Sequence, residues 1–340
     1  DEEQTKGYLG IDGLASFSKL ARELLFTADH EALTSGRAVS LQTPGGTGAL
    51  RVAADFLKRK LPNAKIWLSK PTWANHPKIF EAADRQLETY NYIDPTGTSL
   101  DFAAMLESLQ QIPAGDVVLL HGCCHNPTGA NLNLDQWQLV IDQLNAKGAM
   151  PMIDIAYQGF GDGLEEDAAA TRLVASSVPE CLIAASCSKN FGIYRERTGL
   201  LMAVAQDAEL KALTQDNLSS LNRLNYSFPP DHGARLVTMI LNDDALRADW
   251  KTELEAVRIE MLGLREQLAG ELKRLSNSDR FDFIGQHRGM FSLLGTTPDM
   301  VETLRANNAI YMVPDSRMNI AGLDTATVPI LAKAIIDAGI

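Results

Sequence analysis

Residues 186–192 combine small hydroxyl side chains with a single lysine, Lys189. They follow an apolar stretch, residues 182–185, whose pattern predicts the end of a buried strand. A lysine amine at such a place can form a Schiff base with a carbonyl compound if burial or neighbouring charges keep it unprotonated. Lysines after strands are more often solvated loop residues, so this reading needs support from the rest of the chain.

Polar side chains follow two further apolar stretches. Asn126 comes after residues 117–120, and Asp154 and Tyr157 lie at the end of residues 150–155 and just beyond it. In a mostly parallel sheet, ligands bind beyond the carboxyl ends of the strands. We therefore expect these side chains to converge with Lys189 on one site.

Asp154 closes an apolar strand, and burying an unpaired carboxylate there is costly. Two interpretations remain open at this point. Asp154 caps the following turn, or it faces a cationic partner within the site. A protonated pyridine nitrogen is such a partner, and its ion pair with the carboxylate would keep the ring an electron sink.

Residues 43–50 form a glycine-rich turn that includes Gly46 and Thr47 and leads into a helical pattern. Free backbone N–H groups and the helix dipole make such a turn a ready anion site. It matches neither a P-loop nor the GxGxxG pattern. The alternative is a turn that only begins the helix.

His121, Cys123, Cys124 and His125 suggest zinc at first sight. The cluster lies at a strand end, where successive side chains point to opposite faces, so Cys123 and Cys124 are not expected to bind one ion. A second Cys/His pair is missing downstream. We therefore expect no metal site, and a packing and hydrogen-bonding role for the cluster.

The composition narrows the class of protein. The chain has 340 residues, of which 45% are hydrophobic and 22% charged, as in ordinary globular proteins. A net charge of −12 argues against a nucleic-acid or anionic-membrane partner. We see no apolar run of roughly 20 residues and no signal peptide. The four cysteines lack a disulfide framework, which favours reduced thiols and a cytoplasmic protein.

Short apolar strands alternate with helical patterns through the first two thirds of the chain. Strands are expected at 66–69, 117–120, 150–155, 182–185 and 200–204, and helices at 14–26, 100–109 (capped by Ser99) and 137–144. This alternation predicts an α/β fold, with a mostly parallel central sheet sandwiched by helices.

The pattern changes after Pro229 and Pro230. A long helix is expected from about 245 to 275, then strands at 290–294 and 310–313 and helices at 300–305 and 328–336. We predict a large domain over residues 1–245 and a smaller C-terminal α+β domain over residues 246–340, entered by the long helix.

Taken together, these residues resemble the class I aminotransferases of the aspartate and aromatic amino acid type, which have the fold type I of pyridoxal-phosphate enzymes. The resemblance runs from Tyr8 to the C-terminus. The motifs that carry it are residues 43–50, Trp73 with His76, residues 121–129, residues 154–159, residues 186–192 with Arg197, residues 225–227 (Asn-Tyr-Ser) and residues 316–319 (Ser-Arg-Met-Asn).

The resemblance implies pyridoxal 5′-phosphate as the cofactor. It implies that Lys189 forms a Schiff base with the cofactor and then shuttles a proton between Cα and C4′. Asp154 would pair with the pyridine nitrogen. Tyr157 and Asn126 would hydrogen-bond the phenolic oxygen, and Trp73 would stack on the ring.

The resemblance also implies how phosphate and substrate are held. The implied phosphate-binding residues are Gly46, Thr47, Ser186, Ser188 and Arg197. His76 would support Asp154, and Arg317 would bind the substrate α-carboxylate as a bidentate fork. Tyr8 would reach the partner subunit's phosphate and Arg223 the distal carboxylate of its substrate. The resemblance therefore implies a homodimer with shared active sites.

For the substrate, Thr47 and Gly122 look like the aspartate branch. We expect ping-pong transamination of aspartate and 2-oxoglutarate to oxaloacetate and glutamate. The alternative is transfer from tyrosine or phenylalanine to 2-oxoglutarate. Two other interpretations are a different fold type I chemistry, such as decarboxylation or β-elimination, and a catalytically silent dimeric binding protein.

Two features depart from the family pattern. The family has a segment before Tyr8 that carries substrate-closing residues, whereas this sequence begins at Asp1, so we expect it to start partway into a domain. Phe228 stands where a small polar residue is expected. We expect it to alter how Arg223 is held and therefore the side-chain preference.

Overall fold

The computed structural model describes residues 6–340. Its larger body is built on a seven-stranded sheet in the order β1-β7-β6-β5-β4-β2-β3. The strands are β1 (Ala38–Pro44), β2 (Ile66–Lys70), β3 (Leu87–Asn91), β4 (Val117–His121), β5 (Met150–Ile155), β6 (Cys181–Ser186) and β7 (Thr198–Val204). All neighbouring pairs are parallel except those that β7 makes with β1 and β6. The predicted α/β class and mostly parallel sheet are confirmed.

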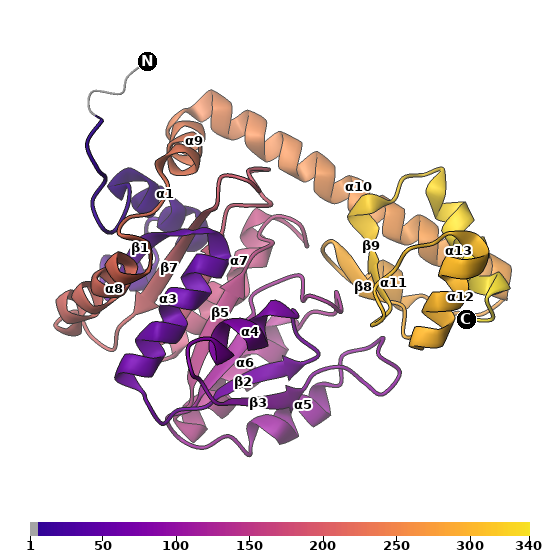
Figure 1. The fold of residues 1–340 in the computed structure, drawn as a ribbon, viewed down its shortest axis with the longest axis horizontal. Helices are drawn as coiled ribbons and strands as arrows, with labels where there is room; N and C mark the ends of the chain where they lie inside the picture. Colours follow the sequence, from indigo (N-terminus) through magenta and orange to yellow (C-terminus); the bar gives the residue numbers. More distant parts are fainter. Residues whose placement is uncertain (1–5) are drawn as a thin grey trace.

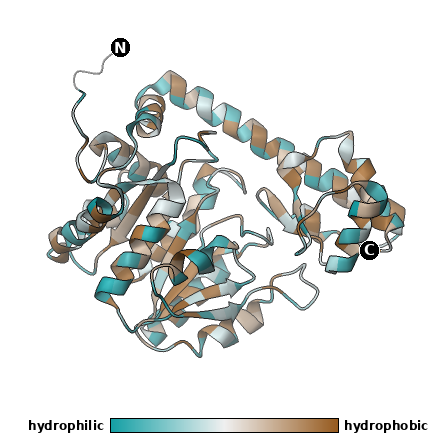
Figure 2. Cartoon of the chain, viewed as in Figure 1, coloured by the Kyte–Doolittle hydropathy of each residue, from teal (hydrophilic) through white to brown (hydrophobic). Residues whose placement is uncertain are grey.

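Both faces of the sheet are buried. Along β4, Val118 and Leu120 belong to one apolar core, while Val117 and Leu119 belong to the other. This alternation follows from the two-residue period of a strand. It also explains why the central strands are continuous apolar runs, visible as brown ribbon in Figure 2.

Helices cover both faces (Figure 1). The face that includes Leu119 packs against α3 (Gly45–Lys60), α4 (Asn75–Glu81) and α8 (Leu210–Tyr226). The opposite face packs against α1 (Ala15–Phe26), α5 (Phe102–Leu109), α6 (Leu134–Lys147), α7 (Leu164–Ser177) and α9 (Asp231–Asn242). The short helix α2 (Glu31–Thr34) lies beside α7.

One long helix, α10 (Asp244–Ser276), connects the body to a smaller lobe at the C-terminus (Figure 1). Its Trp250, Leu254 and Met261 join the core of the large body, whereas Leu268 and Leu272 join a separate core. The small lobe contains α11 (Phe283–Gln286), β8 (Phe291–Leu293), α12 (Pro298–Asn308), β9 (Arg317–Asn319), a 3-10 turn (Ile320–Gly322) and α13 (Thr327–Asp337). The boundary between residues 245 and 246 stays a prediction.

Two local predictions are wrong. Residues 310–313 form no strand, and the antiparallel partner of β8 is β9. Ile310 and Met312 pack against the core of the small lobe, whereas Tyr311 is 79% exposed. Buried and exposed side chains therefore alternate here as in a strand, although the backbone is not paired with another strand. Helix α5 is capped by Asp101, whose carboxylate accepts from the N–H of Ala104, and not by Ser99.

The sequence interpretation also missed β1, β3, α8 and α9. In β1, three polar residues, Ser40, Gln42 and Thr43, are buried, which hides the apolar pattern of a strand. Gln42 accepts a hydrogen bond from the N–H of Leu14 at 2.9 Å and donates to the carbonyl of Pro230 at 2.6 Å. It thereby fixes two distant segments beside the sheet.

The small lobe depends on a fully buried arginine, Arg265 of α10. Its guanidinium donates to the carbonyls of Ile284, Gly289 and Phe291 and to the hydroxyl of Ser292, at 2.6 to 3.1 Å. Burial lowers the pKa of Arg265 to about 10, which still leaves it charged at neutral pH. These bonds hold the loop from α11 to β8 in place.

We predict that Arg265→Met lowers the free energy of unfolding by about 3 kcal/mol, because several buried acceptors lose a charged donor. Urea unfolding measures the change. Arg274→Met is the matched control on the same helix, since Arg274 is exposed and forms its ion pair with Glu271 at the surface, and its effect should be much smaller. Equal effects of the two substitutions would contradict the role given to Arg265.

Candidate active site

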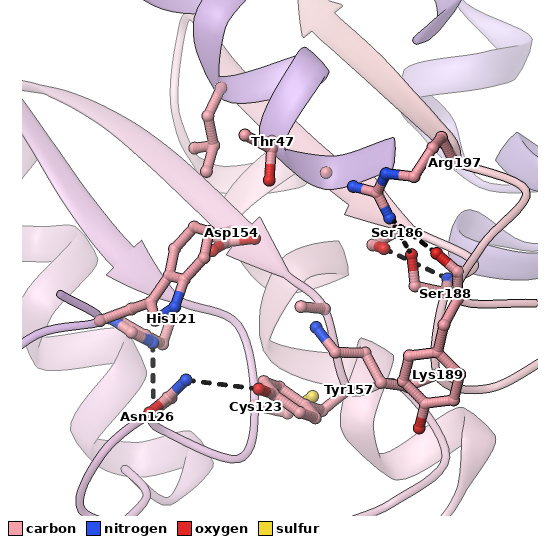
Figure 3. Close-up of a pocket in the computed structure, with 15 residues that line it drawn as sticks. Thr47, His121, Cys123, Asn126, Asp154, Tyr157, Ser186, Ser188, Lys189 and Arg197 are labelled. Atoms are coloured by element: carbon pink, nitrogen blue, oxygen red, sulfur yellow. Dashed lines mark hydrogen bonds between the residues drawn. The ribbon is translucent and has the colours of Figure 1, made fainter. Parts of the chain in front are cut away.

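The polar side chains at the carboxyl ends of β4, β5 and β6 line one cavity with the first turn of α3 (Figure 3). The cavity measures about 210 Å³. Its lining residues are Gly46, Thr47, Leu50, Trp73, His121, Cys123, Asn126, Asp154, Ala156, Tyr157, Ser186, Ser188, Lys189, Tyr194 and Arg197. Ten residues that the sequence predicted as cofactor-binding are therefore brought together. They are Gly46, Thr47, Trp73, Asn126, Asp154, Tyr157, Ser186, Ser188, Lys189 and Arg197.

Lys189 follows β6, and its side chain points into the cavity with the amine 4.4 Å from the centre of the Tyr157 ring. Burial lowers the pKa of Lys189, the charge of Asp154 opposes this, and the charge of Arg197 adds to it. A lowered pKa increases the fraction of neutral amine, which is the nucleophilic form.

Asp154 is only 9% exposed, and its carboxylate lies 2.9 Å from Nε2 of His76. Burial opposes its charge, but the hydrogen bond to His76 and the nearby histidines and Lys189 outweigh this, so the pKa of Asp154 is lowered. The site therefore holds a fixed negative charge inside the protein. A positively charged nitrogen on a bound ring would be stabilised there.

A chain of hydrogen bonds continues from His76. Its Nδ1 lies 2.8 Å from the hydroxyl of Thr72, which lies 3.1 Å from Nε2 of His121. Burial lowers the pKa of His121 to about 3, so this ring is neutral at physiological pH. Thr72 was missed by the sequence interpretation, because one threonine in a loop carries no pattern of its own.

A second chain links the two lobes. Arg317 of β9 donates to Oδ1 of Asn126 at 3.1 Å, and Nδ2 of Asn126 donates to the Tyr157 hydroxyl at 3.3 Å. The Arg317 guanidinium also stacks on the Phe291 ring, 4.6 Å from its centre. Burial and the charge of Asp154 raise the pKa of Tyr157, so its hydroxyl stays protonated at neutral pH.

The first turn of α3 approaches Arg197 and two serines, forming an anion cradle (Figure 3). A Cβ added at Gly45 would lie 2.6 Å from the Arg197 guanidinium, and one added at Gly46 would lie 3.2 Å from Cβ of Ser186. Arg197 donates to the Ser188 hydroxyl at 3.3 Å. Glycine allows this close approach of the backbone, and free N–H groups of the helix begin at this point.

Three predicted residues lie outside the wall of this cavity. Arg317 stands next to it through Asn126. Tyr8 is 90% exposed and packs against Phe228, with ring centres 5.1 Å apart. Arg223 is exposed in the last turn of α8. The wall also contains residues that were not predicted for the site, among them Tyr194, which lies between Lys189 and Arg197 in the sequence.

The expectation that Cys123 and Cys124 point away from each other is wrong. Their Sγ atoms and a carboxylate oxygen of Asp167 lie within 4.8 Å of one another. Strand β4 ends at His121, so the alternation of a strand no longer applies. Cys124 also has a φ of 49°, which turns the chain back on itself. All four cysteines are free thiols, as predicted.

Pyridoxal phosphate fits this set of groups. The cradle of Gly46, Thr47 and Arg197 matches a phosphate, since it offers helix N–H groups and a guanidinium. Asp154 supplies the anion that a pyridinium nitrogen requires, and Lys189 supplies the amine. Trp73 offers an aromatic face in the same cavity.

Comparison with known proteins agrees with this geometry. Residues 1–335 match the family model of the class I and II aminotransferases. An aromatic-amino-acid aminotransferase of Paracoccus denitrificans is 54% identical over the whole chain and 86% of its own length. An aspartate aminotransferase of Salmonella typhi is 45% identical, over 99% of this chain and 85% of its own.

The solved structures give the same result. The aromatic-amino-acid aminotransferase of Burkholderia pseudomallei, covalently bound to pyridoxal phosphate, superposes with a TM-score of 0.96 at 39% identity. The match covers 98% of this chain and 84% of that one. The chain therefore belongs to the class I and II aminotransferases, with the fold type I architecture, and its cofactor is pyridoxal phosphate.

Proposed function

We propose that this aminotransferase transfers the amino group of aromatic amino acids, such as phenylalanine and tyrosine, to 2-oxoglutarate. The observation that carries the proposal is the 54% identity over the whole chain to a relative named for aromatic amino acids. A Pseudomonas aeruginosa relative of the same name is 47% identical. The aspartate aminotransferase reported above is 45% identical. The aspartate preference expected from Thr47 and Gly122 is not supported.

The cavity wall suits an aromatic substrate. Leu50, Trp73, Ala156 and Tyr194 present apolar or aromatic surface in the same space as Lys189. Burying an aromatic side chain against such surface is favourable, because 150 to 250 Å² of apolar area leaves water. Aromatic substrates are therefore compatible with the walls of a single chain.

The side chains of this protein also fit amino-group transfer. Bound pyridoxal phosphate supplies an electron-withdrawing ring that stabilises negative charge at the substrate Cα. Lys189, with its lowered pKa, acts as the base that takes and returns the Cα proton. Arg317 takes the substrate α-carboxylate, since its guanidinium stands beside Asn126 at the edge of the cavity.

The groups around the cofactor have distinct tasks. Asp154, held by His76, would keep the ring nitrogen of the bound cofactor protonated. Tyr157 and Asn126, which are hydrogen-bonded to each other, would bind its phenolic oxygen, and Trp73 would stack on the ring. Gly46, Thr47, Ser186, Ser188 and Arg197 would hold the phosphate.

Aspartate is a second candidate substrate, because the Arg223 guanidinium suits its distal carboxylate. Arg223 lies in the last turn of α8, and Tyr8 packs against Phe228, five residues after Arg223. Both are exposed and stand away from the cavity of their own chain. We infer that the enzyme is a homodimer in which Tyr8 and Arg223 serve the partner's site.

The free cysteines fit a reducing compartment, and we infer the cytoplasm. Within the described residues, no helix is both long and apolar enough to cross a bilayer.

One test of the proposed function concerns Lys189. Lys189→Ala should abolish turnover, because the amine that binds the cofactor and moves the Cα proton is lost. Borohydride reduction followed by mass spectrometry should find cofactor attached to Lys189 in the unsubstituted protein and no attachment in the variant. Lys78→Ala, at an exposed lysine of α4, is the control. A variant that keeps the original rate would refute the assignment.

The second prediction concerns the substrate. With saturating 2-oxoglutarate, kcat/KM for phenylalanine should exceed that for aspartate by about tenfold, or about 1.4 kcal/mol of transition-state stabilisation. Glutamate formation is the readout, and it separates transamination from decarboxylation or elimination. A higher value for aspartate would restore the aspartate interpretation. Cofactor binding without glutamate would favour a silent binding protein.

The third prediction concerns the partner subunit. Lys189→Ala chains and Arg223→Asp chains should each be inactive with aspartate. When the two variants are mixed in equal amounts and refolded, half of the dimers contain one chain of each kind. In a shared-site dimer, such a mixed dimer has one complete site, with Lys189 from one chain and Arg223 from the other. The mixture should therefore recover about a quarter of the original activity. Mixing Lys189→Ala with Lys189→Ala,Arg223→Asp chains is the control. If the equal mixture recovers no activity, Arg223 does not act across the dimer.

A further inference from the structure

The adjacent cysteines after β4 take no part in the proposed reaction. The thiols of Cys123 and Cys124 and the carboxylate of Asp167 bring three candidate ligand atoms within 4.8 Å of one another. The three residues are 8%, 4% and 5% exposed. Among residues 6–340, they are the only group of at least three Cys, His, Asp or Glu side chains with this spacing.

The backbone holds both thiols on one side. Cys124 has a φ of 49°, which reverses the chain direction immediately after Cys123. Gly289 of the small lobe packs on it so closely that an added Cβ would lie 2.5 Å from Cβ of Cys124. Rotation of Cys124 away from its neighbour is therefore restricted by the loop that Arg265 holds.

Asp167 is fixed in the same way. One carboxylate oxygen accepts from the N–H groups of Gly159 and Gly161, each at 2.8 Å, and the other accepts only from the N–H of Asp162, at 3.0 Å. A carboxylate has about four lone-pair positions, so three N–H donors leave one available. These three hydrogen bonds therefore fix the orientation of the carboxylate before any ligand binds.

A second cavity, of about 310 Å³, adjoins these groups. Cys123 and Asp167 line it together with two acidic residues, Asp162 and Glu166. Asp162 is engaged with Arg288 at 2.6 Å, and Glu166 is exposed. The cavity thus offers a route for an ion and room for a water or the Glu166 carboxylate as an additional ligand.

We propose that Cys123, Cys124 and Asp167 form a binding site for one borderline-soft divalent cation, such as Zn²⁺ or Cd²⁺. Two sulfurs and one oxygen, with a fourth position open to the cavity, match the tetrahedral preference of these ions. Metal–sulfur bonds of about 2.3 Å place two tetrahedral sulfur ligands about 3.8 Å apart. This separation lies within the spacing of the three ligand atoms.

Charges around the site set its pH dependence. Thiols and carboxylates bind a metal ion in their deprotonated forms, so Cys123, Cys124 and Asp167 would have to lose any protons they carry. The ion must displace these protons, so affinity rises with pH. Asp162 and Glu166 favour the cation, whereas Arg265 and Arg288 oppose it. A site that releases two thiol protons gains about 100-fold in affinity per pH unit near neutrality.

The test is a Cd²⁺ titration of the reduced, chelator-treated holoenzyme, followed by the ultraviolet thiolate-to-metal charge-transfer absorption and by calorimetry. We expect one Cd²⁺ per chain, with affinity rising from pH 6 to pH 7. Cys123→Ser and Cys124→Ser should each weaken binding by at least about 100-fold, and Asp167→Asn by about tenfold. Cys181→Ser, at a buried thiol outside the cluster, should bind like the unsubstituted protein.

Several results would overturn the proposal. These are an absent charge-transfer band, a band that survives both serine substitutions, and binding seen only at millimolar Cd²⁺. Cadmium NMR of the unsubstituted protein covers the case in which a serine variant fails to fold. A chemical shift typical of two thiolate ligands supports the site, and one typical of oxygen and nitrogen ligands alone rejects it.

Discussion

A carboxylate has to stay ionised at the centre of the sheet, and much of the site geometry depends on this one constraint. Asp154 lies next to the end of β5, opposite His121 of β4, in a position that is 9% exposed. An unpaired charge there would take up a proton. The protein prevents this with His76, which Thr72 orients and connects to a neutral His121. The first turn of α4 and the end of β4 are therefore tied to the same carboxylate.

The small lobe contributes to the site through very few groups. Arg317 donates to Asn126, and Asn126 donates to Tyr157, so the Arg317 guanidinium and the Tyr157 hydroxyl share one amide. The loop before β8 closes on the large body where the N–H of Arg288 donates to the carbonyl of Gly129. Arg265 holds that loop from within the small lobe. A change buried in the small lobe can therefore alter the position of Asn126 without touching the cavity.

The sequence was informative wherever side-chain type and strand periodicity coincided. Lys189, Asp154 and Asn126 each follow a continuous apolar run, and the carboxyl ends of parallel strands meet at one edge. It was uninformative where tertiary contacts decide the outcome. The buried polar side chain of Gln42 interrupts the apolar pattern of β1, so that strand was not predicted. Ile310 and Met312 pack inward in alternation without forming a strand. The positive φ of Cys124 changes the side-chain direction expected from a strand. The roles proposed for Tyr8 and Arg223 would depend on a second chain, which the local pattern of one chain does not encode.

Substrate preference was the hardest property to predict, and the site explains why. In the proposed function, the residues with the clearest motifs, from the Gly46 turn to Arg197, would hold the cofactor, which serves every substrate alike. Such contacts bind all substrates equally and cannot discriminate among them. Discrimination has to come from surfaces that meet the substrate side chain. In the proposed function these would be the apolar wall of Leu50, Trp73 and Tyr194 and the guanidinium of Arg223. An aromatic ring would need only the first surface, whereas aspartate would also need the arginine. Tyr8 packs against Phe228, five residues after Arg223, so aromatic surface follows that arginine along the chain.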